Sequence, residues 1–245
     1  MFHFTAFHIL LPIYGIVLGS FIGVFYHRLI RGNNNRNIIS RSECDKCHQK
    51  LRIWELFPLL SFLFLKGKCH RCKEKISNEY FWIELFFLVL SCNILMLDLH
   101  IIELYLILFV IGLLVIQAIS DLLNKELFTS ISFFVIICGL ILSTSFATYS
   151  SIYSSIVGIF SGFFALFIIN KIYYFLKKRD GIGGGDFILF GAILGLHGIE
   201  MFGPVLLIAS VVTLGIGYLT SSLNKEMPFG TGLAVAGIIF LLSSF

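Results

Sequence analysis

Long apolar runs, separated by short polar stretches, dominate the chain and predict helices that cross a membrane. A helix that rises about 1.5 Å per residue needs roughly 17 to 25 apolar residues to cross about 30 Å of hydrocarbon. Eight runs approach or meet this length: 7–30, 80–97, 101–119, 127–147, 152–176, 187–199, 203–221 and 229–245. Their apolar residues do not alternate as those of barrel strands do. The pattern predicts an all-α membrane protein, a polytopic bundle of about eight transmembrane helices.

The composition agrees with this pattern and excludes an ordinary soluble domain. Hydrophobic residues make up 58% of the 245 residues and charged residues only 13%, with a mean hydropathy of +0.94. These values lie far outside the range of soluble globular domains. The first run has no basic segment before it and no A-x-A-like site after it, so we expect it to remain as a membrane helix.

The basic residues predict the orientation in the membrane, because short loops rich in Lys and Arg stay in the cytoplasm. Twelve of the eighteen Lys and Arg residues lie between Arg28 and Lys75, and the other six fall on the same side once eight helices are threaded. Both termini should therefore lie outside and the large loop in the cytosol. The net charge of +4 is explained by this asymmetry and by membrane lipid, and no nucleic acid is needed.

The large loop, residues 32–78, contains two CxxC pairs and is predicted to form an inserted cytosolic subdomain. Cys44 and Cys47 form the first pair, and Cys69 and Cys72 the second. Four thiolates in this arrangement suit a structural zinc ion with a closed coordination sphere. His48 and His70 each follow a cysteine, which leaves a mixed ligand set open. Disulfides are the alternative, although they rarely persist in a reducing cytosol.

The same loop holds a short apolar run, 56–65, that cannot cross the bilayer. It is expected to pack on the membrane interface or within the subdomain, and a re-entrant hairpin is the alternative. Glu84 lies about one turn into the second predicted helix, where a charge needs a partner or an aqueous cavity. A snorkelling side chain or an interhelical contact is favoured for it over catalysis.

Two acids fall on the same side of the predicted bundle. Asp121 lies at the cytosolic end of the third helix, and Asp186 follows the glycines of "GIGGGD" at the start of the sixth. Two carboxylates brought together share a proton, so that one can act as base and the other as acid. This is the chemistry of aspartic proteases, in which water attacks a peptide carbonyl.

Structural roles compete with this interpretation. Asp186 could simply cap its helix, and Asp121 could pair with Lys125 four residues later. The glycine run is expected to allow positive φ angles and a close approach of substrate.

Several short motifs, in order along nearly the whole chain, resemble those of bacterial type IV prepilin peptidases. They are "GSFIGVFYHRL", "CDKC" with "WELFPLLS", "CHRC" with "ISNEYFWIE", the Asp121 segment, "GIGGGD" and "PFGTGLAVAG". The chain departs from the family pattern at Gly23, where Asn is usual, at Phe128 and Thr129, where a Pro-Asp pair is usual, and in PFGTG, where PFGP is more frequent.

The resemblance implies an intramembrane-type aspartic endopeptidase in the bacterial cytoplasmic membrane, with its site facing the cytosol. It would remove the short basic leader of prepilin or pseudopilin precursors after a glycine, in pilus, secretion or competence systems. Many relatives then N-methylate the new terminus with S-adenosylmethionine. The residues that the resemblance assigns are the catalytic pair Asp121 and Asp186, the site-shaping residues Gly181, Gly183, Gly185, Pro228, Phe229 and Gly230, and the metal ligands Cys44, Cys47, Cys69 and Cys72.

The expected organisation is one membrane domain, 1–245, with the subdomain 32–78 inserted and a peptidase core over 101–245. Two other classes remain as alternatives. A transporter would show inverted repeats and polar groups near the midplane, and no convincing repeat is present. A membrane scaffold with a zinc-stabilised partner-binding loop would need the cysteines but neither acid.

Overall fold

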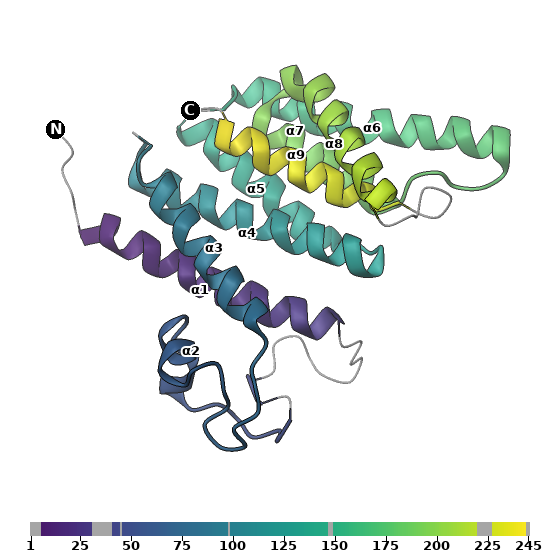
Figure 1. The fold of residues 1–245 in the computed structure, drawn as a ribbon. Helices are drawn as coiled ribbons and strands as arrows, with labels where there is room; N and C mark the ends of the chain where they lie inside the picture. The colour runs from purple at the N-terminus through teal and green to yellow at the C-terminus, as the bar shows by residue number, and fades with distance from the viewer. Residues whose placement is uncertain are drawn as a thin grey trace. The chain divides into compact units, whose positions relative to one another are not determined.

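The fold comes from a computed structural model that describes residues 6–30, 41–44, 46–97, 99–146, 149–219 and 227–243. Within these ranges the chain is helical and contains no strand, which confirms the all-α prediction. The first part of the predicted subdomain, 32–40, and the predicted helix ends at 147, 221 and 245 lie outside the described residues. The helices are α1 (Ala6–Ile30), α2 (Leu60–Phe64), α3 (Asn78–Ile94), α4 (Ile101–Asn124), α5 (Thr129–Ser145), α6 (Ile152–Lys177), α7 (Gly184–His197), α8 (Phe202–Leu219) and α9 (Phe229–Ser243), with short 3-10 turns at Ile53–Leu56 and Ile199–Met201 (Figure 1).

Among the described residues, four segments are long and apolar enough to cross a membrane: Leu10–Arg28, Ile101–Asn124, Ile152–Lys177 and Ile199–Leu219. Three shorter apolar helices, α5, α7 and α9, have 17, 14 and 15 residues. Each of the eight predicted runs is helical. Two helix boundaries differ from the prediction, and both differences affect the acids. Because α4 continues to Asn124 and α7 begins at Gly184, both Asp121 and Asp186 lie inside helical turns.

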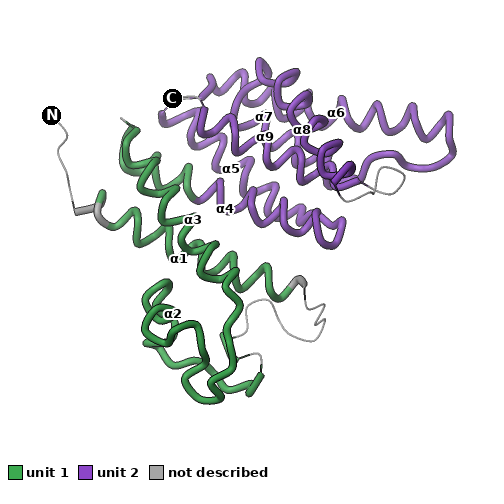
Figure 2. The backbone as a smooth tube through the Cα atoms, in the orientation of Figure 1, with its two compact units in different colours: residues 1–108 green, residues 109–245 purple. Residues whose placement is uncertain are grey.

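The chain forms two compact units, residues 1–108 and 109–245, whose boundary falls inside α4 (Figure 2). In the first unit, α1 packs along α3 through glycines one turn apart. A Cβ on Gly15 would lie 2.6 Å from the Ser91 hydroxyl, and one on Gly19 would lie 3.0 Å from the Glu84 Cα. Small residues at this spacing let two membrane helices approach closely. Gly23 continues the series, since its Cβ would lie 3.2 Å from the Tyr80 ring and would require that ring to shift by a few tenths of an ångström.

In the second unit, α7 is the central helix. From Asp186 to His197 nearly every residue is buried, so this short helix lies among its neighbours. Gly158 and Gly162 of α6 bring that helix against the backbone of α7, because their Cβ atoms would lie 2.6 Å from the Leu194 carbonyl and 3.1 Å from Gly191. Helices α5 and α9 also pack on α7. The helix that carries Asp186 is therefore packed against three neighbouring helices, α5, α6 and α9.

Candidate active site and metal centre

Asp121 lies in the last turn of α4 and is held by the start of α9. Its side chain is buried, and its Oδ2 accepts hydrogen bonds from the Thr231 backbone N–H at 2.6 Å and the Thr231 hydroxyl at 2.9 Å. The backbone N–H of Lys125 donates to the Asp121 carbonyl, but no direct ion pair joins the two side chains in the described structure. Lys125 therefore acts on Asp121 through its charge rather than through a direct ion pair.

Asp186 lies in the first turn of α7 and is likewise buried. Its Oδ2 accepts a hydrogen bond from the backbone N–H of Gly183 at 3.2 Å. A helix-capping role therefore accounts for this oxygen of Asp186 but not for the other. Its other oxygen, Oδ1, is buried and has no hydrogen-bond partner among the described residues. A buried carboxylate oxygen without a partner is costly in free energy and is unusual in a merely structural cap.

Neighbouring residues of α9 connect the two acids. Thr231 binds Asp121, while a Cβ on Gly230 would lie 3.1 Å from Asp186 Oδ1. The two carboxylates are close enough to interact electrostatically. Each acid thus has one oxygen held by backbone or hydroxyl donors and a second oxygen that accepts no hydrogen bond from the described residues. Such a pair can share a proton and hold a water molecule between them.

The predicted glycines act through close approach, and the expectation of positive φ angles is wrong for them. Among described glycines, only Gly67 and Gly198 have positive φ. A Cβ on Gly185 would lie 2.8 Å from the Leu127 Cβ, and one on Gly181 would lie 2.8 Å from the Tyr173 ring. Gly183 instead contributes the N–H that binds Asp186. Side chains from other segments therefore fill the space beside Gly181 and Gly185, whereas a Cβ on Gly184 would meet no atom within 4 Å.

The late motif, Pro228 to Gly230, also allows close packing between segments. Pro228 is buried immediately before α9, and Phe229 is the half-buried first residue of the helix. A Cβ on Gly230 would lie 2.8 Å from a Leu127 methyl group, so Leu127 packs between Gly230 and Gly185. The absence of both side chains brings α9, the loop after α4 and α7 together.

Two positioning residues were not identified from the sequence. Gln117, fully buried and one turn before Asp121, donates to the Phe128 carbonyl at 2.9 Å, accepts from the Phe128 N–H at 2.9 Å and donates to the Ser132 hydroxyl at 2.8 Å. This clamp fixes the loop that carries Leu127. The Phe128 N–H is available because this chain has no proline there.

The second is Asn170 of α6, which holds the glycine loop. Its side-chain oxygen accepts the backbone N–H groups of Gly181 at 2.8 Å and Ile182 at 3.1 Å, and its amide nitrogen donates to Asp180 at 3.0 Å. A signal for both residues was present, since an uncharged amide side chain inside an apolar run needs polar partners. The sequence does not say which partners these are.

The four cysteines of the first unit form one cluster. Their sulfur atoms all lie within 4.8 Å of one another. Each pair lies in a tight turn of the same form: Cys44 N–H donates to the Gln49 carbonyl, Cys69 N–H donates to the Glu74 carbonyl, and the residue after each second cysteine has a positive φ. Two such knuckles facing each other present four sulfurs to one point.

The distances within the cluster fit a metal ion. Tetrahedral zinc with bonds of about 2.3 Å places its sulfurs about 3.8 Å apart, and the Cys44 and Cys72 sulfurs are 3.7 Å apart. This separation is far longer than a disulfide bond, and all four cysteines are free. The histidines face elsewhere, with His48 paired to Glu43 at 3.6 Å and His70 against the Trp54 ring. The donor set is four thiols.

The environment of the cluster favours thiolate character at one ligand. Burial acts to raise the pKa of the Cys44 thiol, but hydrogen bonds from the backbone of Cys47 and Lys46 outweigh it and lower this pKa to about 7. At Cys72, the backbone hydrogen bond from Glu74 favours the thiolate, while the neighbouring cysteine sulfurs raise the pKa to about 11. Four thiols this close cannot all ionise unless positive charge offsets their own, and a zinc ion would supply that charge.

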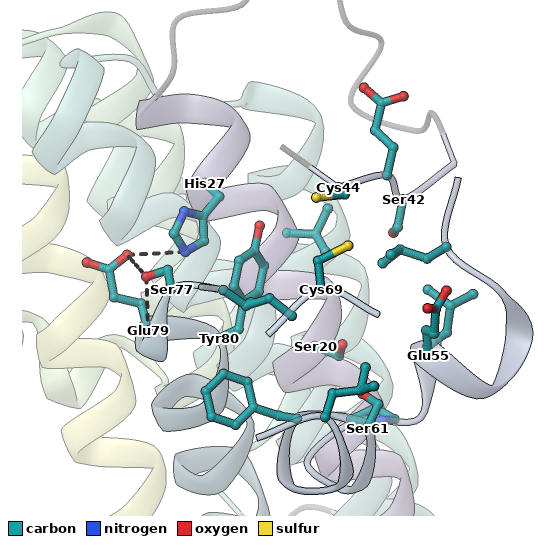
Figure 3. Close-up of a pocket in the computed structure, with 18 of the residues that line it drawn as sticks. Ser20, His27, Ser42, Cys44, Glu55, Ser61, Cys69, Ser77, Glu79 and Tyr80 are labelled. Atoms are coloured by element: carbon teal, nitrogen blue, oxygen red, sulfur yellow. Dashed lines mark hydrogen bonds and ion pairs between the residues drawn. The ribbon is translucent and has the colours of Figure 1, made fainter. Parts of the chain in front are cut away.

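A separate cavity of 780 Å³ lies in the first unit, between α1, the start of α3 and the cysteine-bearing segment (Figure 3). Cys44 and Cys69 line it, as do Ser20, Glu55 and Glu84. Further lining residues form a polar group in which His27 pairs with Glu79 at 3.1 Å, and the Ser77 hydroxyl donates to Glu79 at 3.1 Å. Its volume lies in the range of cofactor sites.

These features define a helical membrane protein with a buried pair of acids in one unit and a four-cysteine centre in the other. Comparisons with known proteins assign the family. The Bacterial Peptidase A24 N-terminal domain matches residues 13–97, and the Type IV leader peptidase family matches residues 107–218. The chain belongs to the type IV leader peptidase family, which confirms the resemblance seen in its motifs.

Three relatives share the description prepilin leader peptidase/N-methyltransferase. The protein from Vibrio cholerae is 30% identical over 96% of this chain and 96% of its own length. The protein from Stutzerimonas stutzeri is 28% identical over 97% of this chain and 91% of its own. The protein from Dichelobacter nodosus is 30% identical over 84% of this chain and 72% of its own length. No solved structure matches the chain.

Proposed function

We propose that this protein is an aspartic-type peptidase that removes the leader from prepilin-like precursors. The family and the names of its relatives support the reaction class. The observation that carries the aspartic assignment is the arrangement of Asp121 and Asp186. In each carboxylate one oxygen is held by hydrogen bonding, the other accepts no hydrogen bond from the described residues, and the two acids interact electrostatically. This is the arrangement that activation of a water molecule needs.

In the proposed reaction, one acid is ionised and the other protonated. The carboxylate removes a proton from water as the water oxygen bonds to the peptide carbonyl carbon, and the protonated acid donates a hydrogen bond to the carbonyl oxygen as it gains negative charge. The C–N bond then breaks, and the leaving nitrogen takes up a proton from the acids. The products are a new carboxyl terminus on the leader and a free amino terminus on the mature protein.

We further propose that cleavage follows a glycine and takes place at the cytosolic face. The asymmetry of Lys and Arg supports a cytosolic position for the basic loops, and Asp121 and Asp186 lie near helix ends rather than at helix centres. A precursor whose hydrophobic stem lies in the bilayer would present its scissile bond at this depth. A short basic leader would remain on the same side as the basic loops, attracted by anionic lipid.

The test is intact-mass analysis of a synthetic prepilin incubated with the purified full-length protein in liposomes. We expect wild type to release the leader and both Asp121→Asn and Asp186→Asn to release none. Glu126→Gln is the matched control, because Glu126 is an exposed acid in the loop after Asp121, and it should cleave normally. Cleavage by either Asn variant, in protein that has wild-type helicity and metal content, would overturn the assignment of the pair.

A second activity, N-methylation of the new terminus, is proposed for the first unit. The names of the relatives include N-methyltransferase, and the 780 Å³ cavity lies within the segment that matches the N-terminal family domain. S-adenosylmethionine, when bound, would supply a methyl group from a sulfonium cation. Five glutamates line the cavity against three basic residues, Arg28, Lys46 and Lys75, and this excess of acidic groups suits a cation.

This second proposal is tested separately from the first. A synthetic mature pilin peptide with a free amino terminus, incubated with S-adenosylmethionine and the Asp186→Asn protein, should gain one methyl mass. Glu55→Gln should reduce methylation of this peptide without affecting leader removal in an otherwise wild-type protein. Methylation that is unchanged in Glu55→Gln and in further cavity variants would place the activity elsewhere.

A further inference from the structure

We infer that the segment from Ile53 to Leu65 is a re-entrant element, which enters the lipid bilayer from the loop side and returns, and that lipid acyl chains cover its outer face. This inference concerns the first unit alone and does not depend on either proposed activity. It selects one of the alternatives that the sequence leaves open for this apolar run.

The depth of the segment follows from its contact with Glu84 of α3, a carboxylate that Ser20 of α1 also contacts. The His27–Glu79 pair marks one level along these two helices. The Leu59 backbone N–H donates to Glu84 Oε2 at 2.7 Å, and Glu84 is five residues further along α3 than Glu79. Ser20 contacts the same carboxylate from α1, seven residues before His27.

At about 1.5 Å per residue, these offsets place Leu59 about 7 to 11 Å inside the level of the His27–Glu79 pair. Half of the hydrocarbon core is about 15 Å thick. Figure 1 shows the same relation, with α2 alongside the middle of α1 rather than beyond its C-terminal end. If α1 crosses the membrane, α2 lies at bilayer depth.

The two faces of the segment differ as a lipid boundary requires. Pro58, Ser61, Phe62 and Leu65 line the cavity, at a spacing of one helical face. The opposite face has large apolar side chains with high exposed fractions: Leu60 at 55%, Leu63 at 60% and Phe64 at 82%. Water-facing positions with this composition would be an aggregation liability, whereas lipid suits them.

The ends of the segment are those of an element that enters and leaves the membrane. Arg52 precedes it, and exposed Lys66 and Lys68 follow it. Lys66 and Gly67 both have positive φ, which turns the chain sharply after α2. The only charge between Arg52 and Lys66 is Glu55, whose carboxylate accepts the Arg52 backbone N–H. Cations at the boundaries suit anionic headgroups.

The experiment uses a tryptophan reporter in the full-length protein in liposomes. The two native tryptophans, Trp54 and Trp82, are replaced by Phe, and Phe64→Trp is introduced. Lipids brominated in their acyl chains should quench its fluorescence at least twofold more than they quench Arg71→Trp, an exposed control in the second knuckle. Aqueous acrylamide should quench in the reverse order.

Two results would overturn the inference. Acrylamide quenching of Phe64→Trp equal to that of Arg71→Trp would mean that the face lies in water. Resistance to both quenchers would mean that protein, either a partner or a second copy, covers the face. If the background without native tryptophans does not fold, Trp82→Phe alone leaves Trp54 of the same segment as the reporter, with the same expected order of quenching.

Discussion

Gly230 of α9 lies so close to the acid pair that a single added methyl group would contact Asp186. In Gly230→Ala the new Cβ would lie 2.8 and 2.9 Å from the Leu127 methyl carbons and 3.1 Å from Asp186 Oδ1. Leu127 has little room to move away, because its Cβ already packs against Gly185. Overpacking of this kind destabilises a folded protein by about 1 to 3 kcal/mol.

We expect the effect on cleavage to exceed the effect on stability. Catalytic geometry is sensitive to displacements well under 1 Å, and a displacement of about 1 Å can reduce a rate roughly 100-fold. Gly230→Ala should therefore slow leader removal at least about tenfold by the intact-mass assay. The control is Gly215→Ala in α8, where a Cβ meets no atom within 4 Å; it should cleave at the wild-type rate.

The double variant Leu127→Ala/Gly230→Ala separates the two contacts. It removes the clash with the Leu127 methyl groups and keeps the contact with Asp186, so thermal stability should recover more than cleavage does. Full recovery of cleavage would attribute the defect to packing alone. Wild-type cleavage by Gly230→Ala itself would refute the close approach of α9 to Asp186.

Three further substitutions test other parts of the structure. Gln117→Met should lower the melting temperature and slow cleavage, because it leaves the backbone N–H and carbonyl of Phe128 unpaired at about 1 to 3 kcal/mol each; Gln117→Glu should do the same, because it keeps the acceptor but replaces the amide donor with a buried carboxyl group. Asn170→Leu should loosen the loop at Gly181, seen as faster proteolysis there in detergent. Cys69→Ser should reduce bound zinc, measured by atomic absorption, from one ion per chain to well below that, while Cys92→Ser should leave it unchanged.

The helical fold was predictable from the sequence because membrane helices satisfy their backbone hydrogen bonds locally, so that hydropathy alone finds them. The sequence also indicated that Asp121 and Asp186 lie on one side, since threading determines sidedness. The start of α7 was predicted three residues late, at Phe187, because the glycines before it carry no apolar signal.

The partners of each site residue could not be predicted. Thr231 is 110 residues from Asp121, and nothing local to either residue indicates the contact. Gln117 and Phe128 lie closer together in the sequence, but the hydrogen bonds between them depend on how α4 and α5 pack against each other. Similarly, the glycines beside Asp186 suggested backbone freedom, whereas their role is to admit Leu127 and Tyr173, which only the packing reveals.

The separation of Asp121 and Thr231 in the sequence also affects when the site can form during synthesis of the chain. A ribosome that adds about 5 to 20 residues per second needs roughly 5 to 20 s to go from one residue to the other. Throughout that interval Asp121 exists without the two donors that hold its Oδ2. A chain that stops before α9 therefore holds both acids but lacks the donors that hold Asp121, and the insertion of α9 supplies them.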